Sequence, residues 1–319
     1  MFATLLGALP RPVRAGDSSP TDLDDLDPLI QVAVRAQEDA GHEPITDGRL
    51  RDPGFDRLAE LLLAPDPAAA VALVVDGWRA TAALTERATK QALPGPLSVG
   101  LRGGESGRDA RTHVAADGLA AITAALSDAG CPLVELEEPG PQRLADDGEL
   151  NLFLDAHRRL AEGSHVSEIH RSLSFVGGSA PQAAIDAILE LPYASLAVDL
   201  IAGPDSWYLV RRAPRDRGIV AGVQSGNEQD EAKEVMHWAA HYAASSGGRG
   251  MDRVGLGSAG SWTSLPWDAA VRKLHALGNA ARLAAMPPGE DLARQLDPKA
   301  VSSRRAAVGH DVPRPRRSR

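Results

Sequence analysis

Short apolar runs alternate along the chain with longer stretches in which apolar positions recur every three to four residues. The short runs are typical of buried strands and the longer stretches of amphipathic helices. This alternation predicts a parallel sheet with crossover helices. The predicted strands are Phe2–Leu6, Glu43–Thr46, Thr89–Leu93, Leu133–Glu137, Val166–His170, Ser195–Asp199, Gly218–Val223 and Arg253–Leu256.

Most connections between these strands have a helical pattern. The predicted helices are Asp27–Ala40, Phe55–Leu63, Val114–Ala129, Leu150–Ala161, Pro181–Leu189, Glu228–Ser245 and Pro266–Ala285. The segment Ala68–Arg87 fits a strand through VALVV or a helix through its alanines. Eight strands can close into a TIM (β/α)8 barrel without an exposed edge, so we predict one barrel domain over residues 1–286. A doubly wound sheet could use the same elements, but the loop after the first strand lacks G-x-G-x-x-G.

The composition changes after Met286, where Pro-Pro-Gly is followed later by a basic PRPRRSR end. This segment can bury little apolar surface, so residues 287–319 are predicted to be a disordered, flexible basic tail. Charge runs of this kind are usually solvated, although the basic end could instead contact an acidic partner.

Charge and cysteine content narrow the class of protein. The net charge of −9 disfavours a nucleic-acid surface, and no apolar stretch reaches the roughly 20 residues that span a bilayer. The single cysteine, Cys131, fits a reducing compartment. The opening MFATLLGALPRP lacks the basic start of a signal peptide. We therefore expect a cytoplasmic protein that acts on a small molecule, with no nucleic-acid or membrane partner; a homodimer is compatible with this.

The chemistry of such a barrel sits where the strands end, because the following loops converge there. We predict His170, Glu137 and Asp199 as catalytic residues on this basis. The predicted substrate-binding residues are Glu138, Arg102, Asp47, Ser172, Arg171, Gln224 and Asn227.

Three acids stand close together in the strand that runs to Glu137. Glu135 and Glu137 should share one face by the period of two, and Glu138 should begin the loop. Their mutual repulsion predicts either a raised pKa or a cationic partner. A barrel-lining ion pair with an arginine would explain them without catalysis. His170 has the same two interpretations, because a lone inward histidine is often only a core residue, whereas Asp199 would make it an acid–base or metal pair.

Six motifs in order resemble the catalytic half of cobalamin-independent methionine synthases, over roughly residues 2–285. They are LLGALPRP, AQEDAGHEPITDGRLR, LPGPLS, AGCPLVELEEP, GIVAGVQS and RVGLGSAGSW. Several of them belong equally to the wider superfamily that includes uroporphyrinogen decarboxylase. The resemblance implies a (β/α)8 barrel with its site at the carboxyl ends of the strands.

The resemblance also implies which site residues have changed. The family's zinc ligands would fall on His170, Ser172, Asp199 and Ala259, so both thiolates are replaced. The serine that contacts the amino acid falls on Ala8, the tryptophan that stacks on folate on Arg102, and a loop histidine on Asn227. We expect no tightly bound metal and no zinc, regard folate as disfavoured, and leave the cofactor otherwise unknown.

Three functions remain open at this point. An enzyme would use His170 as acid or base, Glu137 and Glu138 to hold an amine, and Arg102 or Arg171 to hold a carboxylate or phosphate. Its reaction would be methyl or alkyl transfer, a lyase step or a decarboxylation. A non-catalytic barrel would bind a metabolite or a partner protein. A uroporphyrinogen-decarboxylase-like enzyme would need a basic pocket, for which Arg11, Arg49 and Arg51 are candidates.

Overall fold

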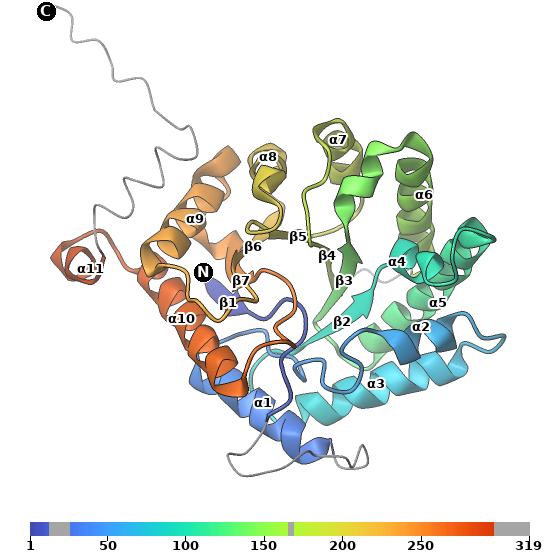
Figure 1. Cartoon of the computed structure of the whole chain (residues 1–319), viewed down its shortest axis with the longest axis horizontal. Coiled ribbons are helices and arrows are strands. Elements are labelled where there is room, and N and C mark those ends of the chain that lie inside the picture. Colours follow the sequence, from blue (N-terminus) through green and yellow to red (C-terminus); the bar gives the residue numbers. More distant parts are fainter. Residues whose placement is uncertain (13–25, 165–168, 297–319) are drawn as a thin grey trace, which may run out of the picture.

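Seven parallel strands form one curled sheet in the computed structural model of this chain (Figure 1), which describes residues 1–12, 26–164 and 169–296. The spatial order of the strands is β1-β7-β6-β5-β4-β3-β2. Their bounds are β1 Phe2–Thr4, β2 Lys90–Pro94, β3 Leu133–Pro139, β4 His170–Val176, β5 Ser195–Asp199, β6 Gly218–Gln224 and β7 Val254–Ser258. An α/β fold with a parallel sheet is therefore confirmed, and six of the eight predicted strands overlap an observed strand by three residues or more.

The predicted second strand, Glu43–Thr46, is reduced to a single bridge between Ile45 and Thr89. The backbone of this segment still forms hydrogen bonds to residues at both edge strands of the sheet, β1 and β2. Glu43 N donates to Ala3 O at 2.8 Å on the β1 side, and Ile45 N donates to Ala88 O at 2.9 Å on the β2 side. Pro44 has no N–H to donate, which limits this segment as a strand.

The predicted fifth strand shares only His170 with β4, which begins at that residue, and residues 166–168 lie outside the described part of the chain. The sequence HRSLSFV alternates polar and apolar residues. Ser172 was expected at the end of the strand and Ser174 beyond it, but both lie within β4 and pair in the register with Glu135 and Glu137, on the inside of the curl. This displacement moves His170 from the carboxyl to the amino end of the sheet.

Helices surround the sheet on its outer side (Figure 1). Their bounds are α1 Asp27–Asp39, α2 Asp56–Leu62, α3 Ala68–Ala82, α4 Pro96–Leu101, α5 Arg108–Asp128, α6 Asp147–Gly163, α7 Ile185–Leu189, α8 Trp207–Arg212, α9 Lys233–Ser245, α10 Trp267–Ala285 and α11 Glu290–Gln295. The 3-10 turns are η1 Pro141–Ala145, η2 Gln182–Ala184, η3 Pro204–Ser206, η4 Ser246–Gly248 and η5 Met251–Arg253. The ambiguous segment after residue 67 is thus the helix α3.

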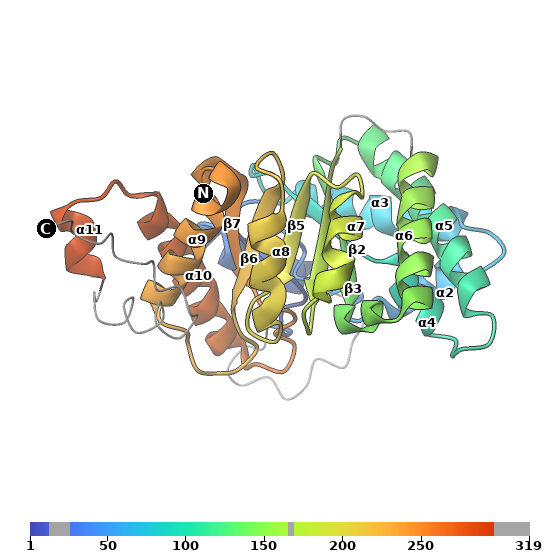
Figure 2. The ribbon, with the colours of Figure 1, turned by 90° about the horizontal axis from the view of Figure 1, so that it is seen from above.

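Helix α11 lies outside the ring, beyond α10, in both views (Figures 1 and 2). It falls inside the segment that was predicted to be a flexible tail from residue 287, so that prediction does not hold for residues 290–295. Residues 297–319, which include the basic end, lie outside the described part of the chain.

The two faces of the sheet differ in chemistry. The outer face packs on the helices through a large apolar core that includes Leu93, Leu136, Phe175, Val198 and Leu256. The inner face holds only a small separate apolar cluster of Leu6, Ala197 and Val220, with Phe2 packed against it. Elsewhere, the inner face carries polar side chains. Among the described residues, no helix is long and apolar enough to cross a bilayer.

Candidate functional site

The inner face of the curl carries charged and hydroxyl side chains along β2, β3 and β4. Glu135 pairs with Ser172 in the strand register and Glu137 pairs with Ser174. Register partners in neighbouring parallel strands point to the same side, so these four side chains form one polar stripe. The prediction that Glu135 and Glu137 share a face is confirmed.

Each inward acid has a cationic partner. Lys90 Nζ lies 2.8 Å from Glu135 Oε2, and Arg49 Nη1 lies 2.6 Å from Glu137 Oε2. Burial raises the pKa of Glu137, and the nearby Glu135 adds to the rise, although Arg49 opposes both. The prediction of a cationic partner or a raised pKa therefore holds on both counts for Glu137.

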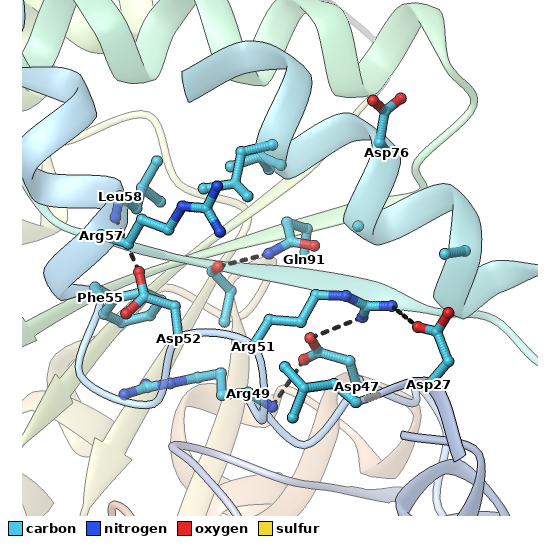
Figure 3. Close-up of a pocket in the computed structure, with 16 residues that line it drawn as sticks. Asp27, Asp47, Arg49, Arg51, Asp52, Phe55, Arg57, Leu58, Asp76 and Gln91 are labelled. Atoms are coloured by element: carbon cyan, nitrogen blue, oxygen red, sulfur yellow. Dashed lines mark hydrogen bonds and ion pairs between the residues drawn. The ribbon is translucent and has the colours of Figure 1, made fainter. Parts of the chain in front are cut away.

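Arg49 connects Glu137 to a cavity of about 500 Å³, which we call the arginine crevice (Figure 3). The crevice lies between the segment 47–58 and helix α3 and reaches Gln91 and Ala92 of β2. Its polar lining consists of Asp27, Asp47, Arg49, Arg51, Asp52, Arg57, Asp76 and Gln91, and its apolar lining includes Phe55, Leu58, Leu73 and Val74. A cavity of this size accommodates a small metabolite.

Two of the three arginines in the crevice form hydrogen bonds and ion pairs with other residues of the chain. Arg49 also donates to Pro53 O and stacks 3.9 Å from the ring centroid of Phe55. Arg51 donates to Asp47 Oδ2 at 3.2 Å and to Thr81 Oγ1 at 3.2 Å. Arg57, in contrast, has no hydrogen bond or ion pair with any side chain or carbonyl in the described ranges, and its guanidinium points into the crevice (Figure 3). The crevice therefore presents one cation with free donors.

Glu138 faces the opposite side of β3 from Glu137. Its carboxylate accepts hydrogen bonds from Leu97 N and Ser98 N, both at 2.9 Å, at the start of α4. It also lies 3.2 Å from His157 Nε2 on α6. Gly95 leaves the room for this arrangement, because a Cβ there would lie 2.1 Å from Glu138 Cδ. The expectation that Glu138 and Glu137 together hold a substrate amine is wrong, since Glu138 is buried between sheet and helices.

The three predicted catalytic residues do not meet. His170 is paired with Leu133 in the register, four positions before Glu137, which is about 13 Å along the strand. Asp199 ends β5, six positions beyond the level of His170, or about 20 Å along the strands. Its carboxylate accepts from Ile201 N at 2.9 Å, Ala202 N at 2.8 Å and Gly177 N at 3.2 Å, so it organises two loops. A His170–Asp199 acid–base pair is therefore excluded by position.

The other predicted site residues are dispersed. Asp47 lies in the arginine crevice, and Arg102 reaches the neighbouring turn, where it donates to Asp56 and Gly54 O. Ser172 is buried beside His170 at the amino end of β4.

The last three predicted residues lie away from both places. Arg171 faces outward and donates to Ser164 Oγ at 2.9 Å. Gln224 is buried and accepts from Glu231 N at 3.1 Å. Asn227 is exposed in the loop after β6.

A zinc ion of the kind implied by the sequence resemblance does not fit these residues. His170 and Ser172 lie near the amino end of β4, whereas both Asp199 oxygens accept backbone N–H groups at the carboxyl end of β5. In the described ranges, no three His, Cys, Asp or Glu side chains are grouped so that they could hold a metal ion. We derive no chemical step through a metal.

Two residues of the inner face, Lys90 and Ser174, were missed as site candidates, and Arg49 was named only for a basic pocket, not as the partner of Glu137. Arg49 follows the predicted second strand directly after Asp47-Gly48, which is a carboxyl-end position. It has a positive φ of 54°, which is uncommon for a residue with a side chain. Only the strand register reveals Ser174, because the serine was placed beyond the end of its strand.

Comparison with known proteins gives a fold likeness only. No protein-family model and no curated protein matches the sequence. A B12-independent methionine synthase from Shewanella sp. W3-18-1, solved with selenomethionine, aligns with a TM-score of 0.68 and 14% identity over 88% of this chain and 96% of that chain. A putative vitamin-B12-independent methionine synthase from Listeria monocytogenes gives 0.67 and 15% over 88% and 97%. A methyltransferase from Methanosarcina mazei gives 0.50 and 13% over 66% and 63%. The chain thus has the fold of cobalamin-independent methionine synthase catalytic domains.

Proposed function

We propose that this chain is a methionine-synthase-like barrel enzyme that binds a small anionic or amino-acid-like substrate in the arginine crevice. The observation that carries the proposal is Arg57, whose guanidinium points into a 500 Å³ cavity and has no partner among residues 1–12, 26–164 and 169–296. A guanidinium with free donors binds a carboxylate or phosphate in bidentate geometry. Asp76 on α3 also lines the crevice; it is exposed, lies 3.9 Å from Arg79 Nη1, and keeps a second carboxylate oxygen for a substrate amine.

Glu137 is the residue that we expect to respond to substrate. Arg49 lines the crevice and donates to Glu137, so an anion bound beside Arg49 would weaken its attraction for the Glu137 carboxylate. The pKa of Glu137, already raised by burial, would rise further, and the carboxyl would take up a proton. A carboxyl that has taken up a proton can serve as a general acid. The fold likeness supports methyl or alkyl transfer as the reaction class, without a zinc-activated thiol.

The second candidate function is non-catalytic binding of the same kind of metabolite. It is favoured by the engagement of Asp199 and Glu138 in loop and helix contacts, because these predicted site residues then have no free oxygen for chemistry. It differs from the first candidate only in turnover, so both predict the same binding site.

A thermal-shift panel of amino acids, dicarboxylates and phosphorylated small molecules tests the binding site. Carboxylates should raise the melting temperature of the wild type, and Arg57→Ala should weaken the best ligand by about tenfold, the loss of a charge-assisted hydrogen bond. Arg35→Ala, an exposed arginine on α1, is the matched control and should bind normally. Unchanged binding by Arg57→Ala would refute the proposal.

Calorimetry of the best ligand in buffers of different ionisation enthalpy tests the role of Glu137. Proton uptake on binding by the wild type, lost in Glu137→Gln, is expected for an acid coupled to the crevice. NMR of the bound compound incubated with likely methyl donors separates enzyme from binding protein, since only an enzyme consumes it. A ligand that binds without proton uptake and is never converted would leave the non-catalytic function as the correct one.

A further inference from the structure

A second cavity, of about 660 Å³, opens at the amino ends of the strands, on the opposite side of the curl from Glu137. We call it the amino-terminal cavity. Its walls are mostly apolar and include Phe2, Leu133, Tyr193 and Val220. The inward side chains of β4, β5 and β6 at this level are Ser172, Ser195 and Gly218, which are too short to fill the space.

A buried ion pair with an incomplete set of hydrogen bonds lies in this cavity. The side chains of Lys90 and Glu135 are 1% and 2% exposed, and they meet at 2.8 Å. Within the described part of the chain, Glu135 Oε1 nevertheless has no hydrogen-bond partner, and neither has the Oγ of Ser172, its register neighbour. A buried carboxylate oxygen without a partner is costly, so such groups usually mark a place where a water or a ligand donates.

Most other polar groups of the cavity are engaged, and the exposed carboxylates of Asp216 and Asp252 lie at its mouth beside two arginines. His170 Nε2 lies 2.7 Å from Ser195 Oγ, and burial lowers the pKa of His170, so its ring is neutral at physiological pH. Glu43 Oε1 accepts from Ala88 N. The two arginines at the mouth, Arg217 and Arg253, donate to backbone carbonyls.

We propose that the amino-terminal cavity is a binding site for an uncharged, mainly apolar small molecule that carries a hydroxyl or amide donor. The ligand would donate to Glu135 Oε1 and its oxygen would accept from the Ser172 hydroxyl, while the apolar body would lie against Phe2, Leu133 and Val220. This site is separate from the arginine crevice and does not depend on the function proposed for it.

The charges around the free oxygen select against ionised ligands. An anion would meet Glu135 and Glu43, and a cation would be brought close to the buried ammonium of Lys90. Either charge would also lose its hydration among apolar walls, and the two acids and two arginines at the mouth, Asp216, Asp252, Arg217 and Arg253, balance to no net charge. A neutral donor completes the hydrogen bonds of the ion pair and brings no charge of its own.

Three probes of one shape test this selectivity: cyclohexylmethanol, cyclohexylmethylamine and cyclohexanecarboxylate, titrated by saturation-transfer NMR against the full chain at pH 7. We expect the alcohol to bind about tenfold or more tighter than either charged probe, the equivalent of one well-placed hydrogen bond without buried charge. Equal or tighter binding of a charged probe, or no binding of the alcohol, would overturn the proposal.

Two variants locate the binding. Ser172→Leu should fill the cavity and abolish alcohol binding. The double variant Lys90→Met with Glu135→Leu replaces the ion pair by apolar side chains, which a fold usually tolerates, and should weaken the alcohol about tenfold by removing its acceptor. Alcohol binding that persists in both variants refutes the site. Arg57→Ala should not change alcohol binding, and Ser172→Leu should not change carboxylate binding in the arginine crevice, so the two proposals fail independently.

Discussion

Arg49 and Glu137 join parts of the sheet that are not adjacent strands. Arg49 Nη1 donates to Glu137 Oε2 at 2.6 Å, and their side chains are only 8% and 12% exposed. Arg49 lies in the segment that leaves the single bridge at Ile45, whereas Glu137 is on β3, one strand beyond β2. The ion pair thus connects the segment 47–58 to the inner face of the sheet, next to the single bridge that replaces the predicted second strand.

Removal of one partner should cost more stability than removal of both. Arg49→Met leaves the Glu137 carboxylate buried and unpaired, so we expect a loss of about 3 kcal/mol in the free energy of unfolding. The double variant Arg49→Met with Glu137→Leu should recover most of that loss. Urea titrations of the three proteins measure the difference, and an additive double variant would mean that the pair is not coupled.

The stability of the wild type should depend on the ionisation of Glu137. An acid whose pKa is higher in the folded than in the unfolded state binds more protons when folded. The free energy of unfolding therefore falls as pH rises from the ordinary value of 4.5 toward the raised pKa of Glu137. Glu137→Gln should lose this decline, whereas Glu60→Gln, an exposed position on α2, should keep it. A wild-type-minus-variant difference that grows with pH would contradict the prediction.

His42 should produce the opposite pH dependence. It is fully buried, its Nε2–H donates to Leu274 O at 2.9 Å, and burial lowers its pKa to about 4. The unfolded state takes up a proton near pH 6.5 and the folded state only near pH 4. Stability is therefore present above pH 6.5 and is lost as pH falls to about 4, by up to about 3 kcal/mol. His42→Gln, measured by denaturant titration at each pH, should be flatter over this interval; an equal slope would refute the assignment.

Glu138 should prove to be structural. Glu138→Ala removes the acceptor for two N–H groups of α4 and for His157, so we expect a loss of about 3 kcal/mol. Gly95→Ala should destabilise the same contact, because its Cβ would overlap Glu138. Ligand affinity in the arginine crevice, measured on the folded fraction, should not change. If Glu138→Ala lost ligand affinity but kept its stability, Glu138 would be a binding residue and not a structural one.

Two buried serines should respond differently to the same truncation. Ser174 Oγ is buried without a hydrogen-bond partner, so Ser174→Ala should be neutral or stabilise by about 1 kcal/mol. Ser258 Oγ donates to Leu6 O and accepts from Leu6 N at 2.7 Å, so Ser258→Ala should destabilise by about 1–3 kcal/mol. Thermal melts of the two variants give the comparison. A clear destabilisation by Ser174→Ala would indicate an ordered water bound to that hydroxyl.

The local sequence pattern was sufficient to predict most helices and strands and to place two acids of β3 on the same face of the sheet. The apolar run Ser195–Asp199 has the same bounds in sequence and structure, and the period of two placed Glu135 and Glu137 together. Those features depend on residues near in sequence, where side-chain alternation is a property of the backbone. The same pattern failed at β4, because serines facing a polar interior look like loop residues when the interior is not known to be polar.

The sequence by itself determined the parallel α/β architecture, the inward pair of acids and the need for cationic partners. Only the tertiary structure identified Lys90 and Arg49 as these partners. It also placed His170 at the opposite end of the sheet from Glu137, and it placed the Glu138 side chain between the sheet and the helices. The physical reason is that the alternation of side chains is the same whether a strand ends or begins at His170. The two placements put His170 at opposite ends of the sheet, and only contacts with strands far away in the sequence distinguish them.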